Sequence, residues 1–310
     1  MADRTPLREV AVPDAPADEL ELDAPNRTPP TRELATTDLR ELLPGVEPER
    51  QVDDWGRSER VEGALDATVV EFLYRLWFRC EVEGIENVPD EGGALVVSNH
   101  AGALPPDAAM IAKAIKEEHP RSRRLYLTVE HFFKGYPGFS MLAAKIGGVP
   151  AHPANVHRLL YDEGQLVLVF PEGRKGTEKL YRDRYRLRRF GRGGFVEAAM
   201  RAGTPLVPVA VVGAEEAAPI FAQVPLLQRL TGFIYFPITP TFPHFGVLGM
   251  LGYLPAKFKI RFLPPVRTDD MGDEPWEDKS LVQTVAHDIR ATIQDEVFDM
   301  IGSRESVWFG

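Results

Sequence analysis

The sequence has a single cysteine, Cys80, among its 310 residues. One thiol cannot form an internal disulfide, which fits a protein of the reducing cytoplasm. No uncharged run of helical composition reaches the ~20 residues that a membrane span requires. The chain opens with polar and acidic residues, without the charged-then-apolar pattern of a secretion signal. These absences argue against an integral or secreted protein, but not against one that lies on a bilayer.

Several chemical signatures are missing as well. The seven histidines show no HxxxH spacing and there is no cysteine pair, so the sequence predicts no metal site. Because Gly-x-Ser-x-Gly is absent and Cys80 falls on an expected core face, a hydrolase with a serine or cysteine nucleophile is not favoured. No nucleic-acid fold signature accompanies the net charge of −10, so nucleic acid is not an expected partner.

The acidic charge is concentrated near the start of the chain. Residues 1–60 hold fifteen Asp and Glu against eight Lys and Arg, whereas the other 250 residues hold 31 and 28. Residues 1–57 also contain eight prolines and few aromatic residues. Such a segment cannot bury enough apolar surface to offset the entropy lost on ordering. We expect 1–57 to be a disordered arm, with a short helix at Glu33–Leu43.

Beyond this arm, strand-like apolar runs alternate with segments of helical periodicity. The expected strands are 81–88, 94–98, 125–129, 165–170, 206–212 and 258–263. The expected helices are 65–80, 106–118, 132–146, 154–162, 194–202 and 279–301. Alternating strands and helices favour right-handed crossovers. The sequence therefore predicts an α/β fold with a mostly parallel central sheet and helices on both faces. A domain over 58–268 is expected, with a C-terminal helix in 269–310 packed on it.

Polar motifs follow two of these strands directly. Ser98-Asn99-His100 comes after Ala94–Val97, and Phe170-Pro171-Glu172-Gly173-Arg174 comes after Leu166–Val169. In open α/β sheets, ligands bind at the carboxyl ends of the strands. The two motifs are therefore a candidate active site.

His100 and Asp107 carry the most specific chemistry in this candidate site. A neutral imidazole can take a proton from an alcohol, provided that a partner on its other nitrogen fixes the tautomer. Asp107 reaches the ring if the chain folds back through Gly102 and Pro105-Pro106. Two structural alternatives stay open: Asp107 as an acid in the first turn of a helix, and His100 as a hydrogen-bonded histidine at a strand end.

The second motif and the residues after it indicate an anion site. Arg174 offers a planar fork suited to phosphate, Gly173 permits close backbone approach, and Glu172 can bond a hydroxyl. Only two acids, Glu178 and Asp183, interrupt the run of basic residues that follows. This basic run is Arg174, Lys175, Lys179, Arg182, Arg184, Arg186, Arg188, Arg189 and Arg192. The alternative is a solvated loop.

No Lys, Arg, Asp or Glu occurs between Arg229 and Lys257. Prolines at positions 237, 240, 243 and 255 forbid a single spanning helix in this apolar segment. The segment is either an irregular part of the core or a loop that meets a bilayer or an acyl chain. With the helix Leu65–Cys80 and the basic run, it suggests a cytoplasmic protein bound peripherally at the inner face of the membrane.

Taken together, the motifs resemble a known family. Asn99-His100 followed by an Asp, Phe170–Arg174, and Pro205–Val209 resemble the glycerolipid and lysophospholipid acyltransferase superfamily, the type that includes 1-acylglycerol-3-phosphate acyltransferase. Gly191–Phe195 and Gly213–Glu216 resemble its monoacylglycerol-acyltransferase-like branch. The likeness covers about residues 65–268.

The resemblance implies that a fatty acyl group moves from an acyl-CoA or acyl-carrier-protein thioester to a lipid hydroxyl, with no cofactor beyond that co-substrate. It implies that His100 is the general base and Asp107 its orienting acid. The residues expected to bind the substrate are Asn99, Phe170, Pro171, Glu172, Gly173 and Arg174. The strand Pro205–Val209 is expected to line the acyl or acceptor cleft.

Two departures from the family pattern bear on the substrate. Six residues separate His100 from Asp107, where the family usually has four. The glycine-rich turn at 147–152 ends in His152 rather than in the family's Arg. This favours a neutral acceptor, such as a diacylglycerol or a fatty alcohol, unless another Arg binds the phosphate. A non-catalytic lipid-binding protein on the same fold is the alternative from a different class.

Overall fold

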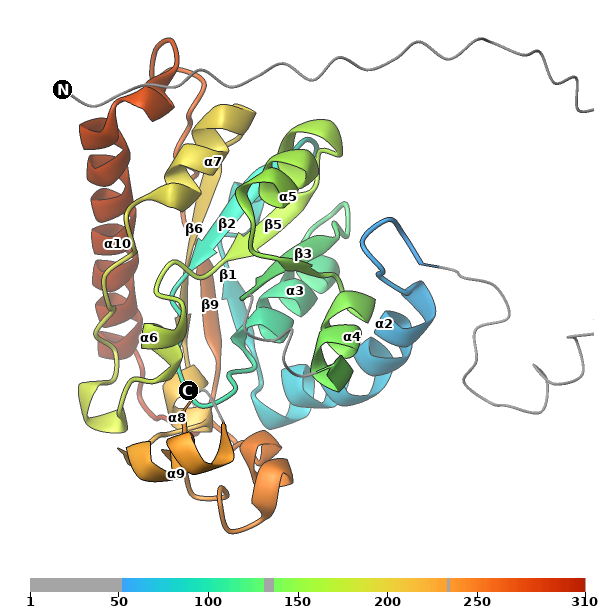
Figure 1. The fold of residues 1–310 in the computed structure, drawn as a ribbon, viewed down its shortest axis with the longest axis vertical. Coiled ribbons are helices and arrows are strands. Elements are labelled where there is room, and N and C mark those ends of the chain that lie inside the picture. Colours follow the sequence, from blue (N-terminus) through green and yellow to red (C-terminus); the bar gives the residue numbers. More distant parts are fainter. Residues whose placement is uncertain (1–51, 131–136, 233–234, 310) are drawn as a thin grey trace, which may run out of the picture. The chain divides into compact units, whose positions relative to one another are not determined.

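Seven strands form one central sheet in the order β1-β9-β6-β2-β5-β3-β4 (Figure 1). Five strands run parallel to one another, while β9 is antiparallel to β6 and β1 is parallel to β9. Their bounds are β1 (Glu81–Glu83), β2 (Ala94–Ser98), β3 (Leu125–Val129), β4 (Gly148–Pro150), β5 (Leu166–Val169), β6 (Leu206–Val212) and β9 (Lys259–Phe262). The predicted mostly parallel α/β sheet is confirmed.

This computed structural model describes residues 52–130, 137–232 and 235–309. Within them, every residue of β2 and of β6 is buried, as expected for central strands of a parallel sheet that is covered on both faces. Leu95 and Val97 of β2 belong to one core cluster, while Ala94 and Val96 belong to another on the opposite face. The two-residue period of the strand therefore divides its side chains between two hydrophobic cores.

One face of the sheet is covered by α5 (Pro153–His157), α7 (Gly194–Ala202) and α10 (Lys279–Gly302) (Figure 1). The Asp278 carboxylate caps α10 by accepting the backbone N–H groups of Ser280 and Leu281. Residues spaced three or four apart along α10 are buried, so one stripe of this helix packs against β6 and α7. Gly203 ends α7 in the left-handed conformation, as the sequence predicts.

The opposite face is covered by α3 (Asp107–Glu118) and by a long helical segment that begins with α2 (Glu59–Leu65). This segment continues through π-helical turns at Asp66–Val70 and Phe72–Trp77. The predicted helix at 65–80 is therefore confirmed, but it begins earlier because the Ser58 hydroxyl caps it. The helix α4 (Pro137–Lys145) packs near α2.

Two expected boundaries are wrong. The arm was expected to extend to residue 57, yet Arg57 is buried and hydrogen-bonds the Leu125 carbonyl, and Trp55 donates its indole N–H to Glu163. These contacts, far away in sequence, draw residues 52–57 into the folded unit. The first strand stops at Glu83 because Gly84 turns the chain at φ +71, where a Cβ would lie 2.1 Å from the Phe262 carbonyl oxygen. The expected helix Glu33–Leu43 lies outside the described residues.

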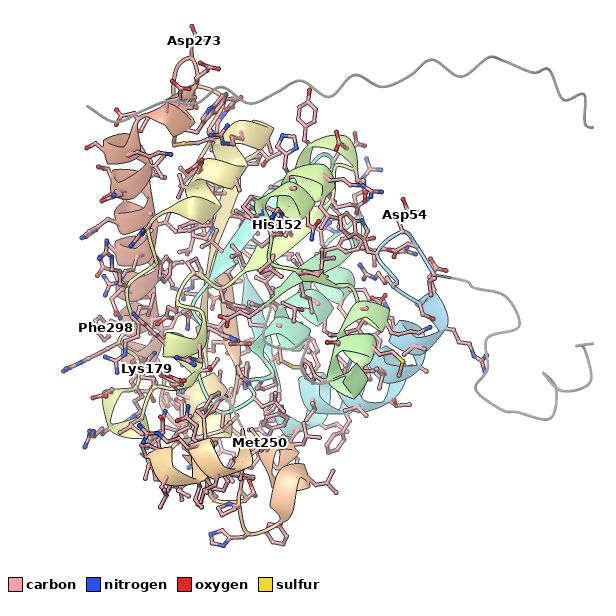
Figure 2. The ribbon with its side chains drawn as sticks, viewed as in Figure 1. Asp54, His152, Lys179, Met250, Asp273 and Phe298 are labelled. Carbon is pink, nitrogen blue, oxygen red and sulfur yellow. The ribbon has the colours of Figure 1, made fainter. Side chains whose placement is uncertain are left out.

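A smaller unit stands at the carboxyl edge of the sheet, which we call the apolar lobe (residues 221–232 and 235–253). It holds β7 (Ala222–Gln223), α9 (Pro225–Thr231), β8 (Pro237–Ile238) and a 3₁₀-helix at Gly246–Leu251. The strands β7 and β8 pair antiparallel as a separate two-stranded sheet. The lobe is the orange region at the lower end of Figure 1, and Met250 marks it in Figure 2.

Among the described residues, no helix combines the length and the hydropathy needed to cross a membrane. The longest, α10, has 24 residues, but polar and charged side chains recur along it.

The environment of Cys80 yields a first prediction. Burial raises the pKa of its thiol to about 12. Since the thiolate is the reactive form, only about one thiol in ten thousand is ionised at pH 8. We expect Ellman's reagent to leave the native protein unlabelled over minutes and to label one thiol per chain after unfolding in guanidinium chloride. Rapid stoichiometric labelling of the native protein would contradict this environment and would make Cys80 a candidate nucleophile.

Candidate active site

His100 and Asp107 meet at the carboxyl end of β2. Nδ1 of the imidazole lies 2.8 Å from Oδ2 of Asp107. The Asp107 side chain is 1% exposed, whereas that of His100 is 18% exposed. The buried carboxylate therefore fixes the ring through Nδ1, and the ring remains open to a ligand. Among the described residues, none hydrogen-bonds Nε2.

The chain between the two residues folds back as a bulged loop, which bridges the longer spacing. Gly102 has φ +90 and Leu104 has φ +45, both in the left-handed region. At Gly102 the backbone packs so closely on α8 (Ala214–Ala217) that a Cβ would lie 2.6 Å from the Ala214 carbonyl oxygen. The N–H of Ala103 donates to the carbonyl of Ala218 at 3.0 Å. The loop is thus docked on a neighbouring element rather than closed on itself.

Asp107 serves both of the roles that the sequence left open. It is the first residue of α3, and its Oδ1 accepts the N–H of Ala108 at 2.7 Å, while Oδ2 holds His100. A carboxylate in a first helical turn is stabilised by the helix dipole, so the same placement favours the charged form that orients an imidazole.

Phe170 and Glu172 come from the end of β5 to the same place. The Phe170 ring stacks on the imidazole with ring centres 4.0 Å apart and an interplanar angle of 16°. The buried Glu172 carboxylate accepts the N–H of His100 at 3.1 Å and the N–H of Arg188 at 2.5 Å. It therefore joins β2, β5 and the basic run. Each of its oxygens accepts one backbone N–H group.

The glycines after Glu172 permit this close assembly. Gly173 adopts φ +53 and ψ −147, and α6 (Arg174–Thr177) begins directly after it. At Gly176 a Cβ would lie 2.4 Å from the carbonyl oxygen of His100. Glycine is required there because α6 packs its backbone against the histidine turn.

Asn99 is not placed as a substrate ligand. Its amide nitrogen donates to the Val211 carbonyl and its amide oxygen accepts the Val211 N–H, both at 2.9 Å. The side chain is buried and imitates one further ladder pair between β2 and β6. Asn99 thereby sets the direction in which the chain leaves β2 for His100, which corrects the sequence-based expectation.

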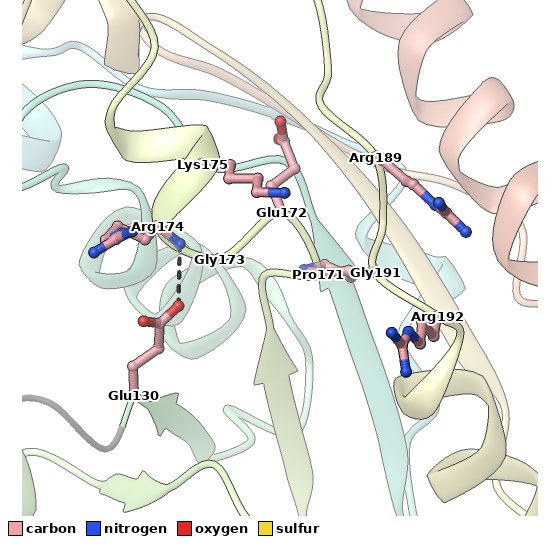
Figure 3. A pocket seen from close by; sticks show the side chains of 9 residues that line it. All are labelled: Glu130, Pro171, Glu172, Gly173, Arg174, Lys175, Arg189, Gly191 and Arg192. Atoms are coloured by element: carbon pink, nitrogen blue, oxygen red, sulfur yellow. Dashed lines mark hydrogen bonds between the residues drawn. The ribbon is translucent and has the colours of Figure 1, made fainter.

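A pocket of about 410 Å³ opens beside Glu172 (Figure 3). Its walls are Glu130, Pro171, Glu172, Gly173, Arg174, Lys175, Arg189, Gly191 and Arg192. Arg174 is not an unpaired cation of this pocket, because the Nε atom of Arg174 forms an ion pair with Glu178 at 2.9 Å. Within the described ranges, Lys175, Arg189 and Arg192 form no ion pair with any acid. Uncompensated cations around a cavity favour an anionic ligand.

His152, at the position where the family has an arginine, does not line this pocket. It begins α5, where its Nδ1 accepts the N–H of Ala154 at 3.2 Å (Figure 2). The positive charge beside Glu172 therefore comes from α6 and from the 189–192 turn rather than from the turn after β4.

Part of the basic run is anchored by two acids whose role the sequence did not reveal, the half-buried Glu215 and the buried Glu216. Glu215 accepts Nζ of Lys179 at 2.9 Å and the N–H of Tyr185 at 2.6 Å. Glu216 accepts the Tyr185 hydroxyl at 2.6 Å and Nη1 of Arg304 at 2.7 Å. Burial raises the pKa of Glu215, and the Lys179 ammonium opposes this effect. Lys179 is therefore paired within the protein, whereas Lys175, Arg189 and Arg192 line the pocket.

The chain is similar in sequence to known proteins. Residues 79–212, which contain both motifs, match the acyltransferase family. An uncharacterised protein of Mycobacterium tuberculosis is 41% identical over 272 residues, which cover 88% of this chain and 75% of that protein. A protein of Mycobacterium leprae is also 41% identical, over 88% of this chain and 73% of its own length.

More distant relatives carry functional names. The "DGAT1/2-independent enzyme synthesizing storage lipids" of Gallus gallus is 28% identical over 63% of this chain and 54% of its own length. The crystal structure of the 1-acyl-sn-glycerophosphate acyltransferase PlsC from Thermotoga maritima matches with a TM-score of 0.49 and 16% identity, over 86% of this chain and 88% of that one. On the family match and the mycobacterial relatives, the chain belongs to the acyltransferase family and is an acyltransferase.

Proposed function

We propose that this protein is an O-acyltransferase that moves a fatty acyl group from an acyl thioester, acyl-CoA or acyl-carrier protein, to the hydroxyl of a glycerolipid or lysophospholipid. His100 acts as the general base. The observation that supports this best is the pairing of Nδ1 with the buried Asp107 carboxylate, which fixes a proton on Nδ1 and leaves Nε2 unprotonated.

The reaction follows from that tautomer. Nε2 takes the proton of the acceptor hydroxyl while the hydroxyl oxygen attacks the thioester carbonyl. Asp107 stabilises the imidazolium that forms. The tetrahedral intermediate then expels the thiolate, which receives the proton from Nε2. The N–H of His100 donates to Glu172 and is not available to an oxyanion, so we assign the oxyanion donors of this turn to the N–H groups of Ala101 and Gly102.

The polar pocket supplies the binding part of the proposal. Pro171 and Gly173 shape its floor, and Lys175, Arg189 and Arg192 provide charge for a phosphate group. That phosphate belongs either to a phosphorylated acceptor or to the nucleotide end of coenzyme A. These cations take the place of the arginine that His152 replaces, so a phosphorylated acceptor remains compatible with this chain.

A neutral acceptor, such as a diacylglycerol or a fatty alcohol, is the second candidate. It is favoured by the storage-lipid name of the Gallus gallus relative and by His152 in place of the family's arginine. In that case the pocket would serve the thioester donor.

We further propose that the protein acts at a membrane surface, at the cytoplasmic face. The apolar lobe exposes large apolar side chains, among them Leu230 at 73%, Phe245 at 73% and Leu248 at 77%. The helical segment after α2 exposes Phe72 and Leu76, and the Trp77 indole N–H donates to the carbonyl of Tyr253 in the lobe. Two adjoining apolar elements thus present one surface that a bilayer would cover.

Removal of the proposed base should separate catalysis from binding. We expect His100→Ala to lower kcat by about a hundredfold or more, and Asp107→Asn to do so through loss of the tautomer. The measurement is transfer of radiolabelled acyl-CoA to a panel of glycerol-3-phosphate, lysophosphatidate, diacylglycerol and fatty alcohol. Lipid binding should survive both substitutions. An unchanged rate in His100→Ala would show that another group is the base.

The free cations of the pocket generate a second test. Arg189→Gln combined with Arg192→Gln should raise KM for the phosphate-bearing substrate about tenfold or more, because each lost contact is charge-assisted. Arg267→Gln is the matched control, since this exposed arginine pairs only with Asp269 away from the site. The substrate whose KM rises identifies whether the pocket serves donor or acceptor. If KM is unchanged for every substrate, the pocket is not a phosphate site.

Membrane association is tested by sedimentation with liposomes of anionic lipid at low salt. Leu230→Glu combined with Leu248→Glu should weaken binding about tenfold or more, because each change removes apolar burial and adds a charge of the same sign as the lipid. Leu226 is another exposed leucine of the lobe. The control is Tyr161→Glu, because Tyr161 is also exposed but lies outside the lobe. Equal binding by wild type and the double variant would rule out the lobe as the contact.

A further inference from the structure

The loop between His100 and Asp107 is held by two phenol groups from the apolar lobe. The Tyr235 hydroxyl accepts the backbone N–H of Leu104 at 3.3 Å. The Tyr253 hydroxyl donates to the carbonyl of the same Leu104 at 2.7 Å. Both backbone polar groups of one loop residue are thus satisfied by side chains that follow it by 131 and 149 positions.

Leu104 needs this support because its backbone is unfavourable by itself. Its φ of +45 lies in the left-handed region, which is unfavourable for a leucine. Its neighbours Ala101 and Ala103 are buried at 2% and 1% exposure, so the loop cannot exchange its bonds freely with water. Backbone groups in such a place require protein partners. Neither a helix nor a strand supplies them at Leu104, and the two tyrosines do.

Tyr235 also lies near the second motif. The Thr177 side chain is next to the Tyr235 phenol, and the Thr177 hydroxyl donates to the carbonyl of Arg174 at 3.1 Å. Tyr235 further packs with Ala103 and Ala218 in a small hydrophobic cluster of its own. This lobe residue therefore packs against the histidine loop and lies near α6, which follows Glu172 and Gly173.

Both phenols remain protonated across the working range of an enzyme. Burial raises the pKa of Tyr253, and the negative charge of Asp107 raises it further. Burial likewise raises the pKa of Tyr235. The bond from Tyr253 to Leu104 thus keeps its donor proton.

We propose that Tyr235 and Tyr253 are positioning residues for acyl transfer, which clamp Leu104 so that Asp107 reaches His100 across six intervening residues. The proposal rests on the proposed function of His100 as the base. The two hydroxyls act on the loop and not on the reacting atoms. In this chain the extended spacing of the dyad is thus compensated by a structure that lies far along the sequence.

The test uses Tyr235→Phe, Tyr253→Phe and the double variant, which keep the rings and remove only the hydroxyls. We expect kcat to fall about tenfold or more in the double variant, since misplacement of a catalytic group by an ångström is costly, with KM for the acyl thioester changed less than about twofold. We also expect the downfield proton resonance of the imidazole Nδ1–H bound to Asp107 to disappear or broaden. That resonance is assigned by its absence in His100→Ala and Asp107→Asn.

Tyr126→Phe is the matched control. The Tyr126 hydroxyl is also a hydrogen-bond donor from a buried tyrosine, to Asp53 at 2.7 Å, but it belongs to the other core. It should lower the melting temperature as the lobe variants do, while kcat and the resonance stay at the wild-type values. If the double variant does not fold, kcat and the resonance are measured on each single variant instead.

The outcomes separate the two proposals. Wild-type kcat and an intact resonance in the double variant would overturn the clamp, and so would a loss of kcat with the resonance intact. Activity retained by His100→Ala would instead overturn the proposed base. The resonance would then still report whether the tyrosines hold Asp107 against His100, because it is measured without substrate.

Discussion

The contact between His100 and Asp107 is the constraint on which the rest of the site depends. A buried carboxylate against a partly exposed imidazole requires the chain to reverse within six residues, and this one does so with two left-handed residues, Gly102 and Leu104. A reversal of that kind is stable only if its backbone groups find partners. The surrounding elements supply them: α8 through Ala218, the lobe through its two tyrosines, and β5 through Glu172, which holds the N–H of His100.

Much of this arrangement could be read from the sequence because its signals are local. The apolar runs at 94–98, 166–169 and 206–212 are buried strands, and a polar motif after a buried parallel strand lies at the ligand-binding edge of the sheet. The glycine and the two prolines between His100 and Asp107 indicated a turn, which is where the structure has one. The start of α3 at Asp107 likewise follows from the proline before it.

The rest depends on contacts between residues far apart in the chain, which no local pattern encodes. Asn99 and Glu172 are polar residues beside a strand end and so resemble substrate ligands. Their actual partners, Val211, His100 and Arg188, are known only once β2, β5 and β6 are neighbours. The limit of the folded unit was misplaced for the same reason, since Trp55 and Arg57 are fixed by Glu163 and Leu125, about 70 to 110 positions away.

The apolar lobe shows how one segment can meet two demands at once. Its outer side chains include exposed leucines such as Leu248, which suit a lipid-facing role, while the buried Tyr235 and the half-buried Tyr253 bond the loop between His100 and Asp107. A segment that packed only into the core would have no cause to expose leucines. One that served only as an anchor would have no cause to bury two hydroxyls beside Leu104. The lobe therefore links the surface at which a water-insoluble acceptor would arrive to the loop that sets the geometry of the proposed base, and substitutions at its two faces should separate binding from turnover.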